Sequence, residues 1–353
     1  MKILVLAQNY PSQDNPYAMS YVHSRNVEYK KLGHEVKVVN FSETNEYKYD
    51  LLDICVFSKK LLDWPDVIVS HAPNIKNHVK ALREVRNKKI IFFFHGHEVL
   101  HQYGDYPQPY SWKKQKLSRK LFIKIYDHLK MSILRKFFKD FSKKNSIGFV
   151  FVSSWMERQF LKNIKLNPQE TGLSAIIPNA CNAFFLDTEY KFDQNEKLAD
   201  CITIRPLDDS KYAVDLVVQA ALNNPEKEFH IYCKGDFFSY NKKPNNVTVI
   251  NKFIQQKDIP ELLNKYHIAM MPTRYDAQGV MVCEMATYGI PVITTDFEVC
   301  VEMLSDFENV QFVNEDSFKE LKFDNIVKME CEKNSKFSPN ILINKELGFF
   351  NEL

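Results

Sequence analysis

Short apolar runs alternate with helix-forming segments along most of this 353-residue chain. Runs that are apolar throughout are typical of strands in a parallel sheet that is buried on both faces. The alternation fades near residue 178 and restarts at residue 201, which predicts an α/β protein with two doubly wound domains and a cleft between them. Strands are expected at residues 3–7, 35–40, 67–70, 90–94 and 148–153, and then at 201–204, 229–233, 247–250, 268–271 and 291–294.

A polar stretch at residues 187–197 is the predicted linker between the two series. It gives a first domain at residues 1–186 and a second domain at residues 187–333. Helices are expected between the strands, at residues 20–32, 213–222, 259–265 and 280–288.

The segment 272–296 carries the most chemical information in the sequence. It predicts a loop, a helix that opens at Gly279 and Val280, a left-handed stop at Gly289 and a short buried strand. The loop follows a strand, so the backbone N–H groups of Gln278, Gly279 and Val280 are expected at the sheet edge where α/β folds hold ligands.

Two carboxylates, Asp276 and Glu284, lie eight positions apart in this segment. Backbone amides suit an anion and carboxylates suit sugar hydroxyls, so the pattern favours a phosphate-bearing, polyhydroxylated ligand. The alternative is that both acids are only helix-terminal charges favoured by the helix dipole.

Two cations open the second domain, because Arg205 ends a predicted strand and Lys211 lies in the loop before the next helix. Cations beside a helix N-terminus form a natural pocket for a diphosphate. Alternatively, they are surface residues paired with Asp208 or Asp209.

His95 follows the very apolar run 90–94 and is expected at the carboxyl edge of the first sheet, facing the cleft. It is either a functional residue, a structural histidine that satisfies loop carbonyls, or a metal ligand together with His97 and His101. A metal site is the least expected, because no Asp-x-Asp pair is present to hold a divalent ion.

The segment around Asp276 and Glu284 resembles the Glu-x7-Glu signature of retaining glycosyltransferases of GT-B fold, most closely family 4, with Asp276 in place of the first Glu. The resemblance implies that Asp276 holds the donor sugar and Glu284 the nucleotide ribose. It also implies that Arg205 and Lys211 neutralise the leaving diphosphate and that His95 lies near the reacting carbon.

The same resemblance implies a metal-independent, hexosyltransferase-type enzyme with no cofactor and a nucleoside-diphosphate sugar as co-substrate. It further implies that residues 334–353 form a helix that packs back on the first domain. A non-catalytic binding subunit that supports a partner transferase is the alternative. A nicotinamide-dependent oxidoreductase is disfavoured, because no Gly-x-Gly-x-x-Gly follows the first predicted strand.

Positive charge is concentrated in residues 111–146, where twelve Lys or Arg against two Asp give +10 in a chain of net charge +3. Apolar residues recur there at helical spacing. One interpretation is an amphipathic surface that docks on anionic lipid; the other is a helix whose stripe packs on the sheet, and both can hold together. Nucleic-acid binding is disfavoured, because no base-reading motif accompanies the charge. The stripe consists of Phe122, Tyr126, Leu129, Ile133 and Phe137.

The seven cysteines are scattered and include no Cys-x2-Cys pair, which favours a reducing, cytoplasmic compartment. With the basic segment, this predicts a peripheral protein at the inner face of the cell membrane. A saccharide acceptor, lipid-linked in the favoured interpretation, would fit cell-surface polysaccharide synthesis.

Overall fold

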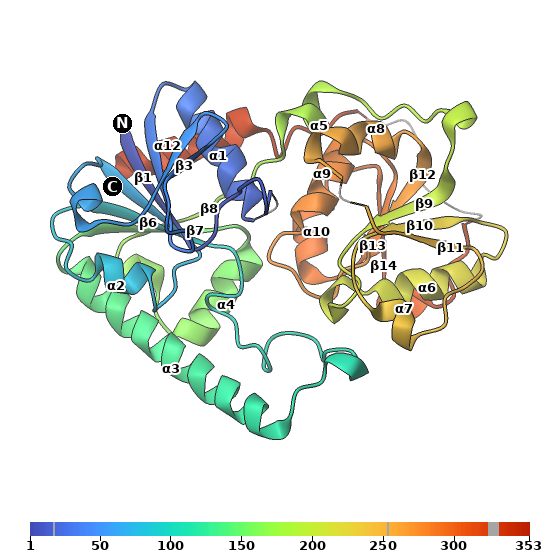
Figure 1. Ribbon diagram of the computed structural model, residues 1–353, viewed down its shortest axis with the longest axis horizontal. Helices are drawn as coiled ribbons and strands as arrows, with labels where there is room; N and C mark the ends of the chain where they lie inside the picture. The colour runs from blue at the N-terminus through green and yellow to red at the C-terminus, as the bar shows by residue number, and fades with distance from the viewer. Residues whose placement is uncertain (17, 253, 324–331) are drawn as a thin grey trace. The chain divides into compact units, whose positions relative to one another are not determined.

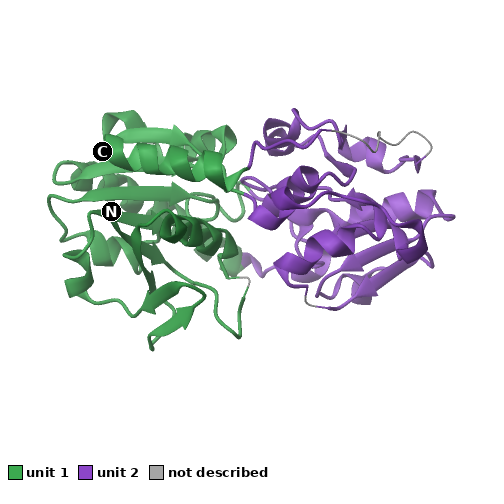
Figure 2. Cartoon of the chain, turned by 90° about the horizontal axis from the view of Figure 1, so that it is seen from above, with its two compact units in different colours: residues 1–105, 118–180, 338–353 green, residues 106–117, 181–337 purple. Residues whose placement is uncertain are grey.

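The computed structural model describes residues 1–16, 18–252, 254–323 and 332–353 (Figure 1). The chain divides into two compact units, each built on one sheet with helices around it (Figure 2). Unit 1 comprises residues 1–105, 118–180 and 338–353, and unit 2 comprises residues 106–117 and 181–337. The predicted α/β class with two doubly wound sheets is confirmed.

Unit 1 contains an eight-stranded sheet in the order β3-β4-β2-β1-β5-β6-β7-β8, parallel except for the β3–β4 pair. Its central strands are buried on both faces, as the apolar runs predicted. The strands are β1 (Lys2–Ala7), β2 (Glu35–Asn40), β3 (Tyr47–Tyr49), β4 (Leu52–Cys55), β5 (Val67–His71), β6 (Lys89–Phe94), β7 (Ser146–Phe151) and β8 (Leu173–Ile176). The helices are α1 (Ser20–Lys31), α2 (His78–Leu82), α3 (Leu117–Ser142), α4 (Ser154–Ile164) and α12 (Pro339–Glu352).

Unit 2 contains a six-stranded parallel sheet in the order β11-β10-β9-β12-β13-β14. All five strands predicted for this half are present, and β14 was not predicted. The strands are β9 (Ala199–Ile204), β10 (Phe229–Tyr232), β11 (Val247–Ile250), β12 (Tyr266–Met270), β13 (Val292–Thr295) and β14 (Val310–Val313). The helices are α5 (Ala183–Asp187), α6 (Val214–Asn223), α7 (Phe237–Tyr240), α8 (Ile259–Leu263), α9 (Val280–Tyr288), α10 (Glu298–Leu304) and α11 (Glu315–Phe318).

The strand order of unit 2 places a topological switch point between β9 and β12, which pair with each other in the middle of the sheet. The chain leaves β9 toward β10 on one side and leaves β12 toward β13 on the other. Loops diverge at such a point and leave room for a ligand at the carboxyl ends of the strands. The loops after β9 and β12 carry Arg205 and Asp276.

The unit boundaries differ from the predicted domains in three places. The division falls at residues 180/181 instead of 186/187, residues 106–117 group with unit 2, and unit 2 ends at residue 337 instead of 333. The predicted linker is not free, because the Tyr190 hydroxyl donates to the Tyr266 carbonyl at 2.6 Å and the Tyr190 N–H donates to the Tyr288 carbonyl at 3.2 Å. Hydrogen bonds to buried elements thus make this polar stretch part of unit 2.

The interpretation in which the stripe at residues 122–137 packs on the sheet, one of the two left open by the sequence, is wrong for four of its five members. Phe122, Tyr126, Leu129 and Ile133 are between 43% and 69% exposed. A second stripe with similar spacing faces the core instead, and it consists of Asp127, Met131, Leu134, Phe138 and Phe141. Because α3 has two apolar faces, helical periodicity could not indicate which one the sheet covers.

The six described cysteines are all free, and Cys331 lies outside the described residues. Within the part of the chain that the structure describes, no helix is long and apolar enough to cross a membrane.

The C-terminal helix α12 belongs to unit 1, where a buried ion pair joins it to α1. The Nε of Arg25 lies 2.8 Å from Oε1 and 2.9 Å from Oε2 of Glu346, and both side chains are almost fully buried. The Tyr29 hydroxyl also donates to Glu346, and Nη2 of Arg25 donates to the side-chain oxygen of Asn179 at 3.2 Å. These bonds partly offset the cost of removing two charges from water.

We expect Glu346→Ala to lower the free energy of unfolding by about 3–5 kcal/mol, because it leaves the Arg25 charge buried without a counter-ion. The double variant Arg25→Met/Glu346→Leu should lose much less, since it removes both charges. Urea unfolding of the two variants measures the difference. Equal losses in both would contradict the assignment of the cost to an unpaired charge.

Candidate functional site

Arg205 occupies the switch point of unit 2 directly after β9. Its side chain is buried, its Nη2 donates to the Thr273 hydroxyl at 2.9 Å, and its guanidinium lies 4.8 Å from the centre of the Tyr212 ring. The Nε atom is buried and has no hydrogen-bond partner among the described residues. Since buried donors in proteins are almost always paired, this nitrogen is a candidate to bind an acceptor from outside the described residues.

Lys211 lies on a 3₁₀ turn, Ser210–Tyr212, in the loop between β9 and α6. Its Nζ is 4.8 Å from the Tyr212 ring centre, so the structure brings Lys211 and Arg205 together on one aromatic ring. The Lys211 ammonium also lies 3.4 Å from a carboxylate oxygen of Asp209, one of the two acids named in the alternative of a surface ion pair. Burial lowers the pKa of Lys211, but Tyr212, Asp209 and Asp276 outweigh it and hold the pKa above its ordinary value.

The loop from Asp276 to Gly279 leads into α9 as predicted. Gly279 has a φ of 75°, which a glycine adopts without strain, and the first intrahelical bonds are donated by Val282 and Cys283 to its carbonyl. The N–H groups of Gly279 and Val280 therefore lie at the open, positive end of the helix. Asp276 accepts a hydrogen bond from the Ala277 N–H at 2.8 Å, which fixes its carboxylate at the start of this loop.

Glu284 projects from α9 and is almost fully buried. One carboxylate oxygen accepts from the Asn182 side-chain amide at 2.9 Å, and the other has no partner among the described residues. Burial raises the pKa of Glu284 to about 7, against the opposing effect of the Asn182 bond. Asn182 thus holds one carboxylate oxygen of Glu284 in place, and the other oxygen remains able to accept a hydrogen bond.

Two comparisons with known proteins bear on this site. Residues 204–327 match the family model described as "Glycosyl transferases group 1", and this region contains every residue of the site in unit 2 except Asn182. HepE of Anabaena, in complex with UDP and glucose, is similar over 100% of both chains with a TM-score of 0.65 and 12% identity.

The structures of a glycosyltransferase from Rickettsia africae and of WaaG, a glycosyltransferase involved in lipopolysaccharide biosynthesis, are also similar. They share 14% and 13% identity with this chain, with TM-scores of 0.64 and 0.59. The similarity to the Rickettsia africae enzyme covers 99% of this chain and 98% of that enzyme's chain. The similarity to WaaG covers 91% of this chain and 89% of the WaaG chain. This chain has the GT-B fold. No curated protein sequence matches it at a significant level.

The family match supports the prediction of a glycosyltransferase within this GT-B chain, whereas membership of family 4 stays a prediction. The structural similarity, at these identities, establishes the fold.

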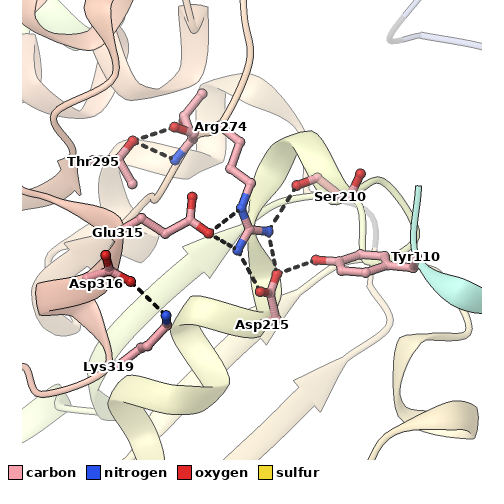
Figure 3. Close-up of polar contacts among 9 residues, drawn as sticks. Tyr110, Ser210, Asp215, Arg274, Thr295, Glu315, Asp316 and Lys319 are labelled. Atoms are coloured by element: carbon pink, nitrogen blue, oxygen red, sulfur yellow. Dashed lines mark hydrogen bonds and ion pairs between the residues drawn. The ribbon is translucent and has the colours of Figure 1, made fainter. Parts of the chain in front are cut away.

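Arg274 ties together the loops of the GT-B chain's second unit (Figure 3). Its guanidinium bonds both carboxylate oxygens of Asp215 at 2.7 Å and Glu315 at 2.6 and 2.8 Å. Its backbone N–H donates to the Lys211 carbonyl at 2.8 Å, which holds the loop after β12 beside the loop after β9. Arg274 was not predicted as a site residue, because its partners are far away in the sequence.

Residues 106–117 supply further support within unit 2. The Tyr110 hydroxyl donates to Asp215 at 2.6 Å (Figure 3). Lys113 pairs with Asp208 at 3.1 Å. The Tyr106 ring contacts the Tyr275 ring, with the two centres 4.8 Å apart. Tyr275 directly precedes Asp276 in the sequence. Residues 106–117 therefore pack against the loops that carry the site, although the sequence assigned this segment to the first domain.

His95 lies in unit 1 at the carboxyl end of β6, as predicted. Its Nε2 is 3.0 Å from Nδ1 of His71, and its ring centre is 4.7 Å from that of Tyr21. Burial, with the Arg25 charge next, lowers the pKa of His95 well below its ordinary value, so the ring is neutral at pH 7. Glu98 accepts hydrogen bonds from the backbone N–H groups of His95 and Gly96, which fixes the loop.

His71 completes this pair of histidines and was not predicted, although it follows the same pattern of a polar residue at the end of an apolar strand. Among the described residues, no group of three or more His, Cys, Asp or Glu is arranged to hold a metal ion.

We expect Arg274→Lys to lower the free energy of unfolding by about 1–3 kcal/mol, because an ammonium cannot reproduce the forked bonds to Asp215 and Glu315. Lys319→Gln is the matched control, since the Lys319–Asp316 pair is exposed and should be worth less than about 0.5 kcal/mol (Figure 3). Thermal unfolding measures both. The interpretation fails if the control loses as much stability as Arg274→Lys.

Proposed function

We propose that this protein is a retaining, metal-independent glycosyltransferase of the hexosyltransferase type, belonging to family 4. It transfers a sugar from a nucleoside-diphosphate sugar to a saccharide acceptor that is linked to lipid. The observation that carries the proposal is the convergence of two cations, Arg205 and Lys211, on one ring beside the loop that leads from Asp276 to the N-terminus of α9. This convergence lies inside the region that matches glycosyl transferases group 1.

In the proposed reaction, the diphosphate of the donor lies against Arg205, Lys211 and the amides of Gln278, Gly279 and Val280. These groups stabilise the negative charge that develops as the bond between sugar and diphosphate breaks. Asp276 orients the sugar, and Glu284 accepts hydrogen bonds from the ribose with the oxygen that has no protein partner among the described residues. The acceptor hydroxyl attacks the sugar carbon from the same face as that from which the leaving diphosphate departs. A phosphate oxygen of this diphosphate takes the proton of the acceptor hydroxyl. His95 contributes a neutral hydrogen-bonding ring near the reacting carbon.

The lipid-linked acceptor is supported by α3, whose exposed face carries apolar side chains among Lys and Arg. A helix with this composition suits the interface of an anionic membrane, so we propose a peripheral protein at the cytoplasmic face. WaaG, which shares the fold, acts in lipopolysaccharide biosynthesis, and this supports a role in the synthesis of cell-surface polysaccharide.

Purified protein should bind UDP- or GDP-sugars and release the nucleoside diphosphate when a saccharide acceptor is present. Lys211→Ala should lower kcat/KM by about 100-fold or more, because it removes one charge that faces the leaving group. Lys242→Ala, an exposed lysine of the same unit, is the control and should behave like the wild type. Absence of binding and turnover with every donor would refute the proposal. Binding without turnover would favour the non-catalytic subunit.

Donor affinity should depend on the ionisation of Glu284, whose pKa is about 7. The carboxylate accepts hydrogen bonds from ribose hydroxyls better than the neutral acid does, so donor binding stabilises the ionised form and weakens as the pH falls below that pKa. Between one pH unit above and one unit below, we expect about a tenfold loss of affinity for UDP or GDP in calorimetry. Glu284→Gln should bind more weakly and lose this component of the pH dependence; an unchanged profile would contradict the role.

A further inference from the structure

A surface cavity of about 290 Å³ lies in unit 1 between the C-terminal half of α3 and the connection from α2 to β6. Its volume is near the lower end of ligand cavities in proteins, which begin at about 300 Å³. Cations and apolar side chains make up most of the lining, which consists of Arg83, Arg86, Lys136 and Lys144, of Ile133, Phe137 and Phe141, and of Asp140.

The charges around this cavity are unbalanced. Asp140 is the one carboxylate in the lining, and it forms an ion pair with Lys143, which lies outside the lining, at 3.3 Å. Glu84, also outside the lining, lies 3.8 Å from Arg83 and pairs more closely, at 2.6 Å, with Lys59. Arg86 donates from Nη1 to the carbonyls of Arg83 and Val85 at 3.0 and 2.8 Å, so its guanidinium is held in place by the backbone. The four cations of the lining still outnumber the carboxylates near them, so an anionic ligand would relieve the remaining repulsion.

The apolar part of the lining continues beyond the cavity along α3. Ile133, which is 43% exposed, is the last member of a row of exposed apolar side chains that runs toward the start of the helix. We name this row the exposed stripe of α3, and it consists of Leu121, Phe122, Ile125, Tyr126, Leu129 and Ile133. The stripe faces away from the buried residues of α3, so no part of the sheet of unit 1 covers it.

The cavity is separate from the predicted catalytic residue of unit 1. It lies beside Lys144 and Arg86, close to the points where β7 and β6 begin, whereas His95 follows the other end of β6. A strand of this length spans about 17 Å at 3.3 Å per residue, so a ligand in the cavity cannot also contact His95. The cavity therefore suits an anchoring ligand and not the acceptor hydroxyl.

We infer that this cavity binds the phosphate headgroup of an anionic phospholipid, while the exposed stripe of α3 enters the adjacent acyl region. The cations match the phosphate, and Ile133 and Phe137 match the first carbons of the chains. The inference deepens the proposed membrane association and is independent of sugar transfer, because lipid binding needs no donor.

The test measures binding of the full chain to vesicles by sedimentation, without a nucleotide sugar. The wild type should bind vesicles of equimolar phosphatidylcholine and phosphatidylglycerol far better than vesicles of phosphatidylcholine alone. Each basic residue near an anionic surface contributes about 1 kcal/mol, so the variant Arg83→Gln/Lys136→Gln/Lys144→Gln should bind about 100-fold more weakly. These side chains are exposed, so the variant should keep its thermal stability.

The matched control is Lys30→Gln/Lys31→Gln/Lys48→Gln, which removes three positive charges from exposed positions of unit 1 outside α3 and outside the lining of the cavity. It should lose clearly less affinity than the cavity variant. Equal losses in the two variants would mean a diffuse electrostatic surface and would overturn the assignment of a site. A second outcome would also overturn the inference. If inorganic phosphate stabilises the wild type but not the cavity variant, and the wild type does not bind vesicles, the cavity belongs to a soluble phosphate.

Failure of this test would leave the proposed glycosyl transfer intact, since donor binding and turnover are measured with a soluble acceptor. Loss of donor binding in the cavity variant would instead mean that the substitutions disturb the fold, and the inference would not survive it.

Discussion

Parallel pairing of β9 with β12 in unit 2 is the constraint on which the candidate site depends. Because both strands run in the same direction, the loops that follow them leave the sheet at one edge, although they are about seventy residues apart in the sequence. Arg205 and Asp276 are carried to this edge by the strands themselves. The Arg274 fork then fixes the two loops against each other through Asp215 and the Lys211 carbonyl. A ligand site is thus built from backbone topology first and side-chain bonds second.

The buried polar atoms of this site indicate what it can bind. Burying a polar group without a partner costs free energy, and native proteins rarely accept that cost without a reason. Here a donor nitrogen of Arg205 and an acceptor oxygen of Glu284 both lack partners among the described residues. A ligand that brings an anion to the first and a hydroxyl to the second would satisfy both. A nucleoside diphosphate carries both groups, which is why the geometry and the family match lead to the same proposal.

Helix α3 has a different organisation, because it carries apolar side chains on two opposite faces. One face packs on the sheet of unit 1 through Met131, Leu134 and Phe138, and the opposite face leaves large apolar side chains exposed. Exposed apolar rows flanked by cations are costly in water and favourable at an anionic interface. The same helix therefore contributes to the core and leaves an apolar, cationic surface exposed, and this surface and the cavity beside Lys136 and Lys144 support the proposed contact with lipid.

The sequence by itself determined the α/β class, most strands and the chemistry of the loop from Asp276 to Glu284. These features are local: apolar runs, a glycine at each end of α9, and two acids at fixed spacing all act over a few residues. Tertiary structure alone decided which face of α3 is buried, which acids hold Arg274, and that residues 106–117 pack with unit 2. Those outcomes depend on contacts between segments far apart in the chain, and periodicity contains no information about which distant segment will cover a given face.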